Sequence, residues 1–498
     1  MRTSILLIAL AAALIEPLGA QVTDSAPGRR QGAARMTMES AVVEAFGGVA
    51  LAADAGVLIV PESRTKATRR VISIPFYRLR STSDTPASPI FLLHGGPGGS
   101  MIDGLQEEGT VEHILFYRGI ADVVIFDQRG GGHALPELAC DETSFIPSHE
   151  PVNLAAIAAA FRETSARCRA DLVAEGVDLG AYNTIENAAD MDALRSALGY
   201  ERVTLIGGSY GTHLALTVMR LFPETVDRVV LHGVEGLDHT WDSPAGRLAV
   251  LERHAAAAEA SAEMGSRIPA AGLIAALRGV IERLDLEPVR VPVPGAPDGS
   301  FETVGGDLIR FLAGYEAGQR NRPNAWPEMI LALSEGDYSF PATVAREIRE
   351  EGIQPDDPVH YTMDCASGIS SARRERLAEE AGVDLLGGVN WEYEEICPVW
   401  DAPDLGDDFR SPLESAIPTV IVHGTWDYST PIENAREVAA TLSNSQLVEV
   451  VTGTHGALYN VFGRWQPMKS LLAAFLRGEE VRFPGEVQLE VQFTAPEG

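Results

Sequence analysis

The chain has 498 residues, of which 45% are hydrophobic and 22% are charged, so its composition is that of an ordinary globular protein long enough for two or three domains. Lysine and arginine number 39 against 70 aspartate and glutamate residues, which gives a formal net charge of −31. Such an acidic surface repels phosphate backbones and anionic lipid headgroups, so nucleic acid is excluded as an expected partner.

The N-terminus has the pattern of a secretory signal peptide. Arg2 precedes an apolar run at 5–15 that is short for a membrane span, and small residues at 18–20 suit cleavage before Gln21. We therefore exclude residues 1–20 from the fold and expect export to a periplasm or out of the cell, with no membrane span in the mature protein. Residues 21–40 resemble a flexible lead.

Short apolar runs separated by helical patterns predict a doubly wound α/β fold with a mostly parallel sheet. A helix is expected at 187–198, where we assign Asp190 and Asp192 to a solvated face. Strands are expected at 71–76, 90–93, 123–126, 203–206, 229–231, 419–422 and 447–451, with a possible edge strand in the alternating residues 487–493.

A glycine-rich loop, His94-Gly-Gly-Pro-Gly-Gly99, follows the predicted strand at 90–93. The backbone of such a loop can approach a reacting carbonyl closely, and its N–H groups can stabilise the charge that develops on the oxygen. We favour the N–H of Gly96, with Gly95 second, and expect His94 to hydrogen-bond the loop. A phosphate-binding loop is excluded, because neither Gly-Lys-Ser/Thr nor a G-x-G-x-x-G in register follows.

The sequence Gly207-Gly-Ser209-Tyr-Gly211 lies between a predicted strand and an amphipathic helix. A G-x-S-x-G pentapeptide in this context predicts a sharp turn, with glycines where a Cβ would clash. The turn would hold the serine hydroxyl at the carboxyl end of the sheet, beside a helix N-terminus. Ser209 is therefore the candidate nucleophile for acyl transfer, and the N–H of Tyr210 is the second expected oxyanion donor.

Two further candidates follow later strands. Asp427 comes after the strand at 419–422 and before a helix that Pro431 can open, and His455 comes after the strand at 447–451. Each residue alone has a plain structural explanation, as turn, helix cap or satisfied histidine. Together their order, serine then aspartate then histidine, matches that of α/β-hydrolases and predicts a catalytic triad.

Glu235 follows the predicted strand at 229–231 and has three interpretations. It could replace Asp427 as the acid of the triad, since some α/β-hydrolases place that acid after the equivalent strand. If Asp427 is the triad acid, Glu235 is available to bind a substrate ammonium group, which a partly desolvated carboxylate does well. The third interpretation is a loop carboxylate that hydrogen-bonds the backbone.

The region between 241 and 410 has a mainly helical pattern, with helices expected at 246–265, 272–284, 304–319, 327–335 and 372–382. A proline-rich stretch at 287–295 has the composition of a linker. We interpret the region as a cap inserted in the sheet domain, where it would shape the substrate pocket. The expected division is a hydrolase core at 21–240, the cap at 241–410, and the second part of the core with a tail at 411–498.

Four cysteines fit an exported protein and allow three disulfide connectivities. We favour the pairs that are close in sequence, Cys140 with Cys168 and Cys365 with Cys397, over four buried thiols. None of the four lies in a CxxC or Cys/His cluster, so no metal site is expected, and serine acyl transfer needs no cofactor.

Three motifs together resemble the proline iminopeptidase and tripeptidyl aminopeptidase family of α/β-hydrolase serine peptidases. They are the glycine-rich loop at 94–99, Asp127-Gln-Arg-Gly130, and the pentapeptide at 207–211. The stretch at 424–431 and Thr454-His455 are similar to the C-terminal segment of the secreted, tripeptidyl-aminopeptidase-like branch.

This resemblance implies an α/β-hydrolase fold and an exopeptidase that releases residues from peptides with a free N-terminus. It makes Ser209 the nucleophile, Asp427 the orienting acid and His455 the base. The chain departs from the family at 131–134, which reads Gly-Gly-His-Ala where the family usually has Thr-Gly-x-Ser. We assign the preceding Asp127 and Arg129 to a buried ion pair or loop clamp.

Two alternatives stay open at this point. A carboxylic-ester hydrolase would use the same triad and would differ in lacking a recognition site for a free amine. A non-catalytic binding module on a hydrolase scaffold would be favoured if a triad position were missing.

Overall fold

The computed structural model describes residues 34–296, 299–317, 325–355, 358–491 and 493. The predicted signal peptide, and the predicted lead as far as residue 33, lie outside the described residues. Within the described ranges, no helix combines the length and the apolar character that crossing a membrane requires.

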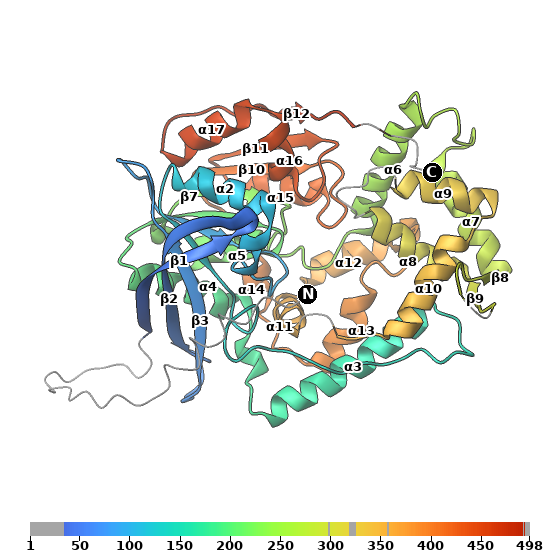
Figure 1. The fold of residues 1–498 in the computed structure, drawn as a ribbon, viewed down its shortest axis with the longest axis horizontal. Helices are drawn as coiled ribbons and strands as arrows, with labels where there is room; N and C mark the ends of the chain where they lie inside the picture. The colour runs from blue at the N-terminus through green and yellow to red at the C-terminus, as the bar shows by residue number, and fades with distance from the viewer. Residues whose placement is uncertain (1–33, 297–298, 318–324, 356–357, 492, 494–498) are drawn as a thin grey trace, which may run out of the picture. The chain divides into compact units, whose positions relative to one another are not determined.

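A ten-stranded sheet forms the framework of the described chain (Figure 1). Its order is β1-β2-β3-β5-β4-β6-β7-β10-β11-β12; β1, β2 and β3 pair antiparallel, and all pairings from β5 to β12 are parallel. The predicted mostly parallel sheet is confirmed. The strands are β1 (Arg35–Ala45), β2 (Val49–Pro61), β3 (Val71–Leu79), β4 (Ile90–Leu93), β5 (Val123–Phe126), β6 (Val203–Gly208), β7 (Val226–His232), β10 (Thr419–Gly424), β11 (Ser445–Val451) and β12 (Glu486–Gln488).

Helices cover both faces of the sheet, which is why the central strands are apolar throughout. In β4, Phe91 belongs to one hydrophobic cluster and Leu92 to another, as the alternation of side chains along a strand requires. The first cluster includes α4 (Thr184–Ala197), α5 (Tyr210–Leu221) and α15 (Ile432–Thr441), and the second includes α2 (Glu108–Arg118), α16 (Ala457–Arg464) and α17 (Pro467–Leu476).

The two edges of the sheet differ from the sequence-based expectation in extent. β1 pairs with β2 along its whole length, so the prediction of a flexible lead is wrong for residues 35–40. Most side chains of β1 are exposed, and backbone pairing holds the strand, so its sequence carries little hydrophobic pattern. At the other edge β12 pairs with β11, which confirms the predicted edge strand over a shorter range.

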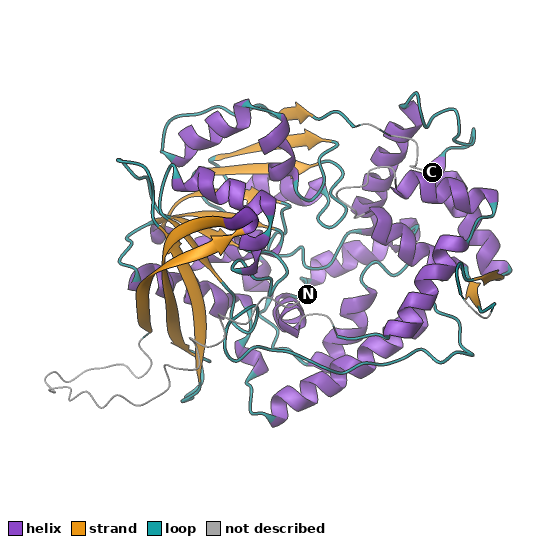
Figure 2. Ribbon diagram, in the orientation of Figure 1, coloured by secondary structure: helices purple, strands orange, loops and turns teal. Residues whose placement is uncertain are grey.

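Residues 244–410, which we call the helical segment, lie beside the sheet and add none of its described strands (Figure 2). Many of its buried residues form a third hydrophobic cluster, to which α3 (Leu154–Ala174) also contributes. The helices are α6 (Pro244–Ala260), α7 (Leu273–Leu286), α8 (Gly306–Ala317), α9 (Ala325–Glu335), α10 (Ser339–Glu351), α11 (Pro358–Ser367), α12 (Ser371–Glu380), α13 (Trp391–Trp400) and α14 (Asp407–Arg410).

The proline-rich stretch at 287–295 is not a linker, as the sequence had indicated, but half of a hairpin. There β8 (Val289–Pro292) pairs antiparallel with β9 (Phe301–Val304). The alternating valines fit a strand, and Pro292 stands at its last position, where a missing N–H is tolerated.

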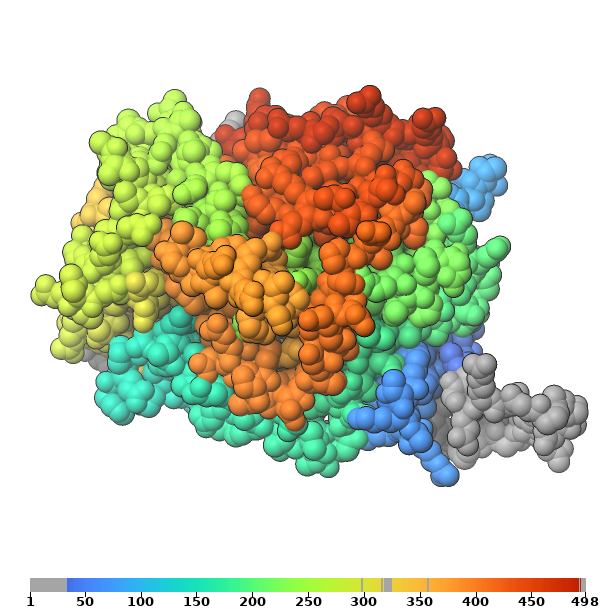
Figure 3. Space-filling model, turned by 180° about the vertical axis from the view of Figure 1, so that it is seen from behind, coloured from blue at the N-terminus to red at the C-terminus, as the bar shows by residue number. Residues whose placement is uncertain are grey.

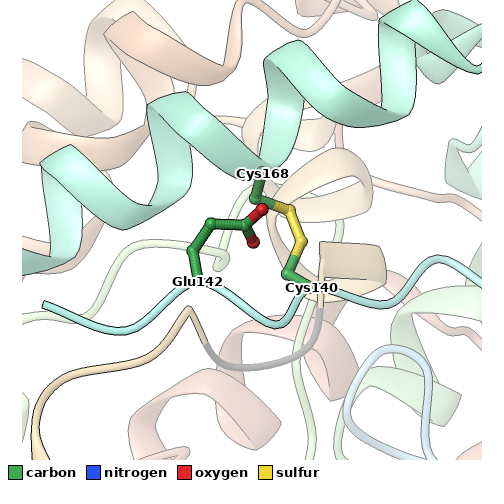
Figure 4. Close-up of side chains that lie close together, drawn as sticks. All are labelled: Cys140, Glu142 and Cys168. Carbon is green, nitrogen blue, oxygen red and sulfur yellow. A yellow bond between two sulfur atoms is a disulfide. The ribbon is translucent and has the colours of Figure 1, made fainter.

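Both predicted disulfides are confirmed, Cys140–Cys168 and Cys365–Cys397. The first joins the chain after β5 to α3, with the carboxylate of Glu142 beside the sulfur atoms (Figure 4). These three side chains are close enough to surround an ion. The sulfurs are bonded to each other, however, and offer no thiolate ligand. The second disulfide ties α11 to α13.

Candidate active site

The predicted sharp turn at the serine is confirmed. Ser209 follows β6 and precedes α5 with φ 55° and ψ −132°, a left-handed conformation that costs free energy in a residue other than glycine. A Cβ on Gly207 would lie 2.3 Å from the carbonyl oxygen of Gly211, and a Cβ on Gly211 would lie 2.1 Å from that of Leu93. Both glycines are therefore sterically required.

The glycine-rich loop passes directly against the serine. A Cβ on Gly95 would lie 2.9 Å from the Ser209 Cβ, and 3.5 Å from its hydroxyl oxygen. Gly96 follows with φ 113°, which favours glycine. The His94 Nδ1 lies 3.0 Å from the Gly95 carbonyl oxygen, so the expected contact of His94 with its own loop is confirmed.

Asp427 and His455 form the buried pair that the motif order predicts. The Nδ1 of His455 lies 3.0 and 2.9 Å from the two carboxylate oxygens of Asp427, whose side chain is fully buried. Burial acts to raise the pKa of Asp427, but the charge and the hydrogen bond of His455 and the hydrogen bond from the Thr430 N–H outweigh it and lower that pKa to about 2. The carboxylate is therefore ionised at neutral pH.

The C-terminal end of β7 lies against both Ser209 and His455. The N–H of Ser209 donates to the His232 carbonyl at 3.1 Å, and a Cβ on the next residue, Gly233, would lie 2.8 Å from the His455 Cε1. Among the described residues, the Ser209 hydroxyl makes no hydrogen bond to His455. Contacts of this kind are often long without substrate and tighten when it binds.

Two residues that the sequence analysis did not select hold the Asp427 loop in place. The Thr430 hydroxyl donates to the Asp427 Oδ2 at 2.8 Å, and its N–H donates to Oδ1 at 2.9 Å. His423, at the end of β10, accepts from the Val234 N–H at 3.0 Å and lies 2.7 Å from the Thr430 carbonyl. Burial lowers the pKa of His423, so it is neutral and donates that second bond.

Glu235 lies close to Ser209, through Thr212, but outside the Asp427–His455 pair. The Thr212 hydroxyl donates to the Ser209 carbonyl at 2.7 Å and accepts from the Glu235 N–H at 2.8 Å. The Glu235 Oε1 is buried and has no hydrogen-bond partner among the described residues. His213 is 3.4 Å from this oxygen, but burial lowers its pKa to about 4, so it carries no charge there.

Two more carboxylates, Asp242 and Asp364, lie near Glu235, and we call the three residues the acidic cluster. Burial and the charges of Asp364 and Asp242 raise the pKa of Glu235 well above its usual range. Burial also raises the pKa of Asp364, and its Oδ1 lacks a partner in the described part of the chain. The Tyr393 hydroxyl donates to the Asp364 Oδ2 at 2.9 Å, which links α11 to α13 at the cluster.

The Asp-Gln-Arg motif has structural roles, with one difference from expectation. Asp127 accepts from the Ser100 hydroxyl and from the His133 N–H, so it clamps the glycine-rich loop. Arg129 is fully buried and binds both carboxylate oxygens of Asp190 at 2.8 Å. The assignment of Asp190 to a solvated face is therefore wrong, because this side chain is the buried partner of the arginine.

The strand order, the turn at Ser209 and the Asp427–His455 pair define a serine hydrolase with the α/β-hydrolase fold. The family model for the alpha/beta hydrolase fold matches residues 88–260, and a second model, of TAP-like protein, matches 385–481. The expected fold class is confirmed.

Individual relatives confirm the resemblance that the motifs indicate. The chain is 24% identical to the YuaR protein of Escherichia coli K12 over 409 residues, which are 78% of this chain and 79% of that protein. It is 31% identical to a tripeptidyl aminopeptidase of Streptomyces lividans over 36% of this chain and 35% of the relative. A proline iminopeptidase of Xylella fastidiosa is 28% identical, over 29% of this chain and 32% of that one. The last two alignments thus span about a third of each relative.

Proposed function

We propose that this serine hydrolase is an exported exopeptidase, which releases residues from the free N-termini of peptides through an acyl-enzyme on Ser209. The observation that carries the proposal is the buried Oε1 of Glu235 near Ser209, which has no hydrogen-bond partner in the described part of the chain. A buried carboxylate without a partner costs free energy, and a substrate ammonium group would supply the partner. The names of two relatives, tripeptidyl aminopeptidase and proline iminopeptidase, support the same substrate class.

In the proposed reaction, the Ser209 hydroxyl attacks the scissile carbonyl carbon while His455 accepts its proton. His455 then gives the proton to the leaving amine as the C–N bond breaks, which leaves an ester on Ser209. Water attacks this ester, His455 takes the proton of the water and returns it to Ser209, and the carboxylate product leaves. Asp427 stays ionised throughout and stabilises the imidazolium.

The oxyanion of each tetrahedral intermediate would be held by two backbone N–H groups, those of Tyr210 and Gly96. Tyr210 is the first residue of α5, so its N–H also benefits from the positive end of the helix dipole. The contact of Gly95 with Ser209 supports a position of the loop beside the reacting carbonyl, and keeps Gly95 as the second choice of donor.

The acidic cluster would bind the substrate ammonium. Without substrate, the raised pKa of Glu235 favours its protonated form in this cluster of carboxyl groups. An ammonium group among them favours the ionised form, and the pair gains a charge-assisted hydrogen bond in a site with little water. Glu235 comes from the β7–α6 connection and Asp364 from α11, so the sheet and the helical segment would share the recognition.

We also propose that residues 241–410 act as the predicted cap and that residues 1–20 direct export. The third hydrophobic cluster supports a cap with its own core. Two disulfides support export, since disulfides persist in oxidising compartments outside the cytosol. The cap would limit access to Ser209 to the end of a peptide.

The decisive experiment compares free and N-acetylated forms of the same peptide amide with short-chain esters. Of the two peptides, we expect turnover of the free one only, and expect Glu235→Gln to raise its KM about 10–100-fold with little change in kcat, because a charge-assisted hydrogen bond is lost. The same substitution should leave ester hydrolysis unchanged. Equal turnover of the free and acetylated peptides overturns the exopeptidase proposal.

Two controls separate recognition from chemistry. Glu252→Gln makes the same change at an exposed site on α6 and should leave KM as it is. Ser209→Ala should lose reaction with a fluorophosphonate and lose turnover, while its circular dichroism stays that of the parent. If esters are cleaved and peptides are not, the ester hydrolase is the correct function.

A further inference from the structure

A hollow lies on the face of the molecule shown in Figure 3, between orange and orange-red segments of the chain. It is a cavity of about 250 Å³ between α5, α12, α15 and the connection from β7 to α6. Leu237 and Val438 contribute apolar surface, and Arg373, Arg376 and Glu437 contribute charge. We call it the arginine pocket.

The arginine pocket is distinct from the candidate active site. Of the described residues, none of the predicted triad and none of the acidic cluster lines it. The connection from β7 to α6 separates the two sites: Glu235 belongs to the acidic cluster, whereas Gly236 and His239 line the pocket.

Arg373 is buried in the pocket wall with incomplete charge compensation. Its Nε and Nη2 donate to the Trp241 carbonyl, and its Nη1 lies 4.0 Å from Glu437, at the limit of an ion pair. Burial and the neighbouring charge of Arg376 lower the pKa of Arg373, despite the opposing effects of nearby carboxylates. A further anion beside this guanidinium would stabilise its charged form.

The carboxylates of the lining already have closer partners than Arg373. Glu437 lies 2.9 Å from the His239 Nε2 and 3.0 Å from the Arg376 Nη1, and these contacts lower its pKa to about 2. Asp238 accepts from both the N–H and the hydroxyl of Ser370, at the start of α12. Glu437 thus serves three cationic or polar groups, and Arg373 has the most distant contact of the three.

We propose that the arginine pocket binds a small organic carboxylate that carries an apolar group. The carboxylate would lie between Arg373 and Arg376, where two guanidinium groups suit its planar, bidentate geometry. The apolar group would pack on Leu237 and Val438. Arg376, whose side chain is 43% exposed, stands where a ligand can enter from solvent.

The test is calorimetric titration of the intact protein with N-acetyl-L-leucine, a carboxylate with an aliphatic side chain and no free amine. N-acetyl-L-leucinamide, which lacks the carboxylate, is the ligand control. We expect the acid to bind and the amide not to bind. Equal binding of the acid and the amide overturns the proposal. A titration in which sodium chloride at the same concentration gives the same heat as the acid also overturns it.

Two variants should shift the affinity in opposite directions. Arg376→Gln removes one guanidinium and should weaken binding about tenfold or more. Glu437→Gln keeps the shape of the side chain but removes the competing negative charge, and should strengthen binding. Arg374→Gln, on the exposed side of the same helix, should change nothing. If Arg376→Gln and Arg374→Gln change the affinity for the ligand equally, and both variants unfold at the same temperature as the parent protein, the assignment is wrong.

Discussion

Asp427 illustrates how single side chains set the electrostatics of the site. A fully buried carboxylate is costly in isolation, yet two hydrogen bonds from Thr430 and the contact of His455 with both carboxylate oxygens keep it ionised. An ionised acid at this place fixes the His455 tautomer with a proton on Nδ1, which leaves Nε2 to act as base.

Thr430 is a positioning residue, because it acts through Asp427. Thr430→Val keeps the shape and removes the hydroxyl donor, so we expect kcat to fall about tenfold with KM unchanged, in line with the loss of a hydrogen bond to a charged group. Steady-state kinetics on the best free peptide measures this. Thr430→Ser retains the hydroxyl and should restore most of kcat; a valine variant with parental kcat contradicts the role.

The sequence predicted the triad candidates but not the residues that hold them in place or lie beside them. Ser209, Asp427 and His455 each follow a strand end within a recognisable motif, so the sequence predicts all three at the same edge of a parallel sheet. Thr430 has no signal beyond being three residues after a loop aspartate. Asp364 lies on α11 in the helical segment, and only the three-dimensional arrangement of α11 brings it to Glu235.

At the scale of elements, the buried parallel strands were the most predictable part, because continuous apolar runs such as β4 and β5 allow few other structures. Prediction failed where pairing rather than burial decides the structure. β1 is mostly exposed, and the β8–β9 hairpin lies among prolines, so neither shows the hydrophobic pattern of a core strand.

The disulfide between α11 and α13 is expected to support both stability and recognition. Its cysteines are 32 residues apart, so replacing Cys365 and Cys397 by serine should cost about 3–4 kcal/mol by the chain-entropy argument. The same helices carry Asp364 and Tyr393, so KM for free peptides should also rise. Thermal unfolding and kinetics on the double variant measure the two effects.

The other disulfide is the matched control. Replacing Cys140 and Cys168 by serine removes a tether of similar span, 28 residues, that joins the chain after β5 to α3 and does not link α11 to α13. Stability should fall by a similar amount, while KM stays at the parental value. A rise in KM in both double variants would show that the effect comes from a general loosening of the fold and not from the loss of the tie between α11 and α13.

At the scale of the whole molecule, the acidic cluster lowers the free energy of unfolding as the pH rises. The folded-state pKa of Glu235 is raised above its unfolded value of about 4.3, so the folded protein binds more protons between these two values. The contribution of Glu235 to the free energy of unfolding is fully present below its unfolded pKa. This contribution is lost as the pH rises through its folded-state pKa. Asp427, with its lowered pKa of about 2, acts only at more acidic pH.

Glu235→Gln should therefore stabilise the protein at alkaline pH while it impairs the proposed recognition. We expect its free energy of unfolding to equal that of the parent near pH 4 and to exceed it increasingly towards pH 8, as measured by urea denaturation. Glu252→Gln, at the surface, should follow the parent at both pH values. A Glu235→Gln protein that is less stable at pH 8 would contradict the unpaired, buried state of this carboxylate.

The bond between Cys365 and Cys397 also bears on how the protein should be produced. Synthesis in the cytosol of an ordinary expression host would leave these thiols reduced, and Asp364 would stand on a helix without its covalent tie. A screen of peptide libraries with such material would under-report substrates that depend on the terminal amine. Secretion into an oxidising medium, with a thiol assay on the purified product, belongs before any search for the natural peptide.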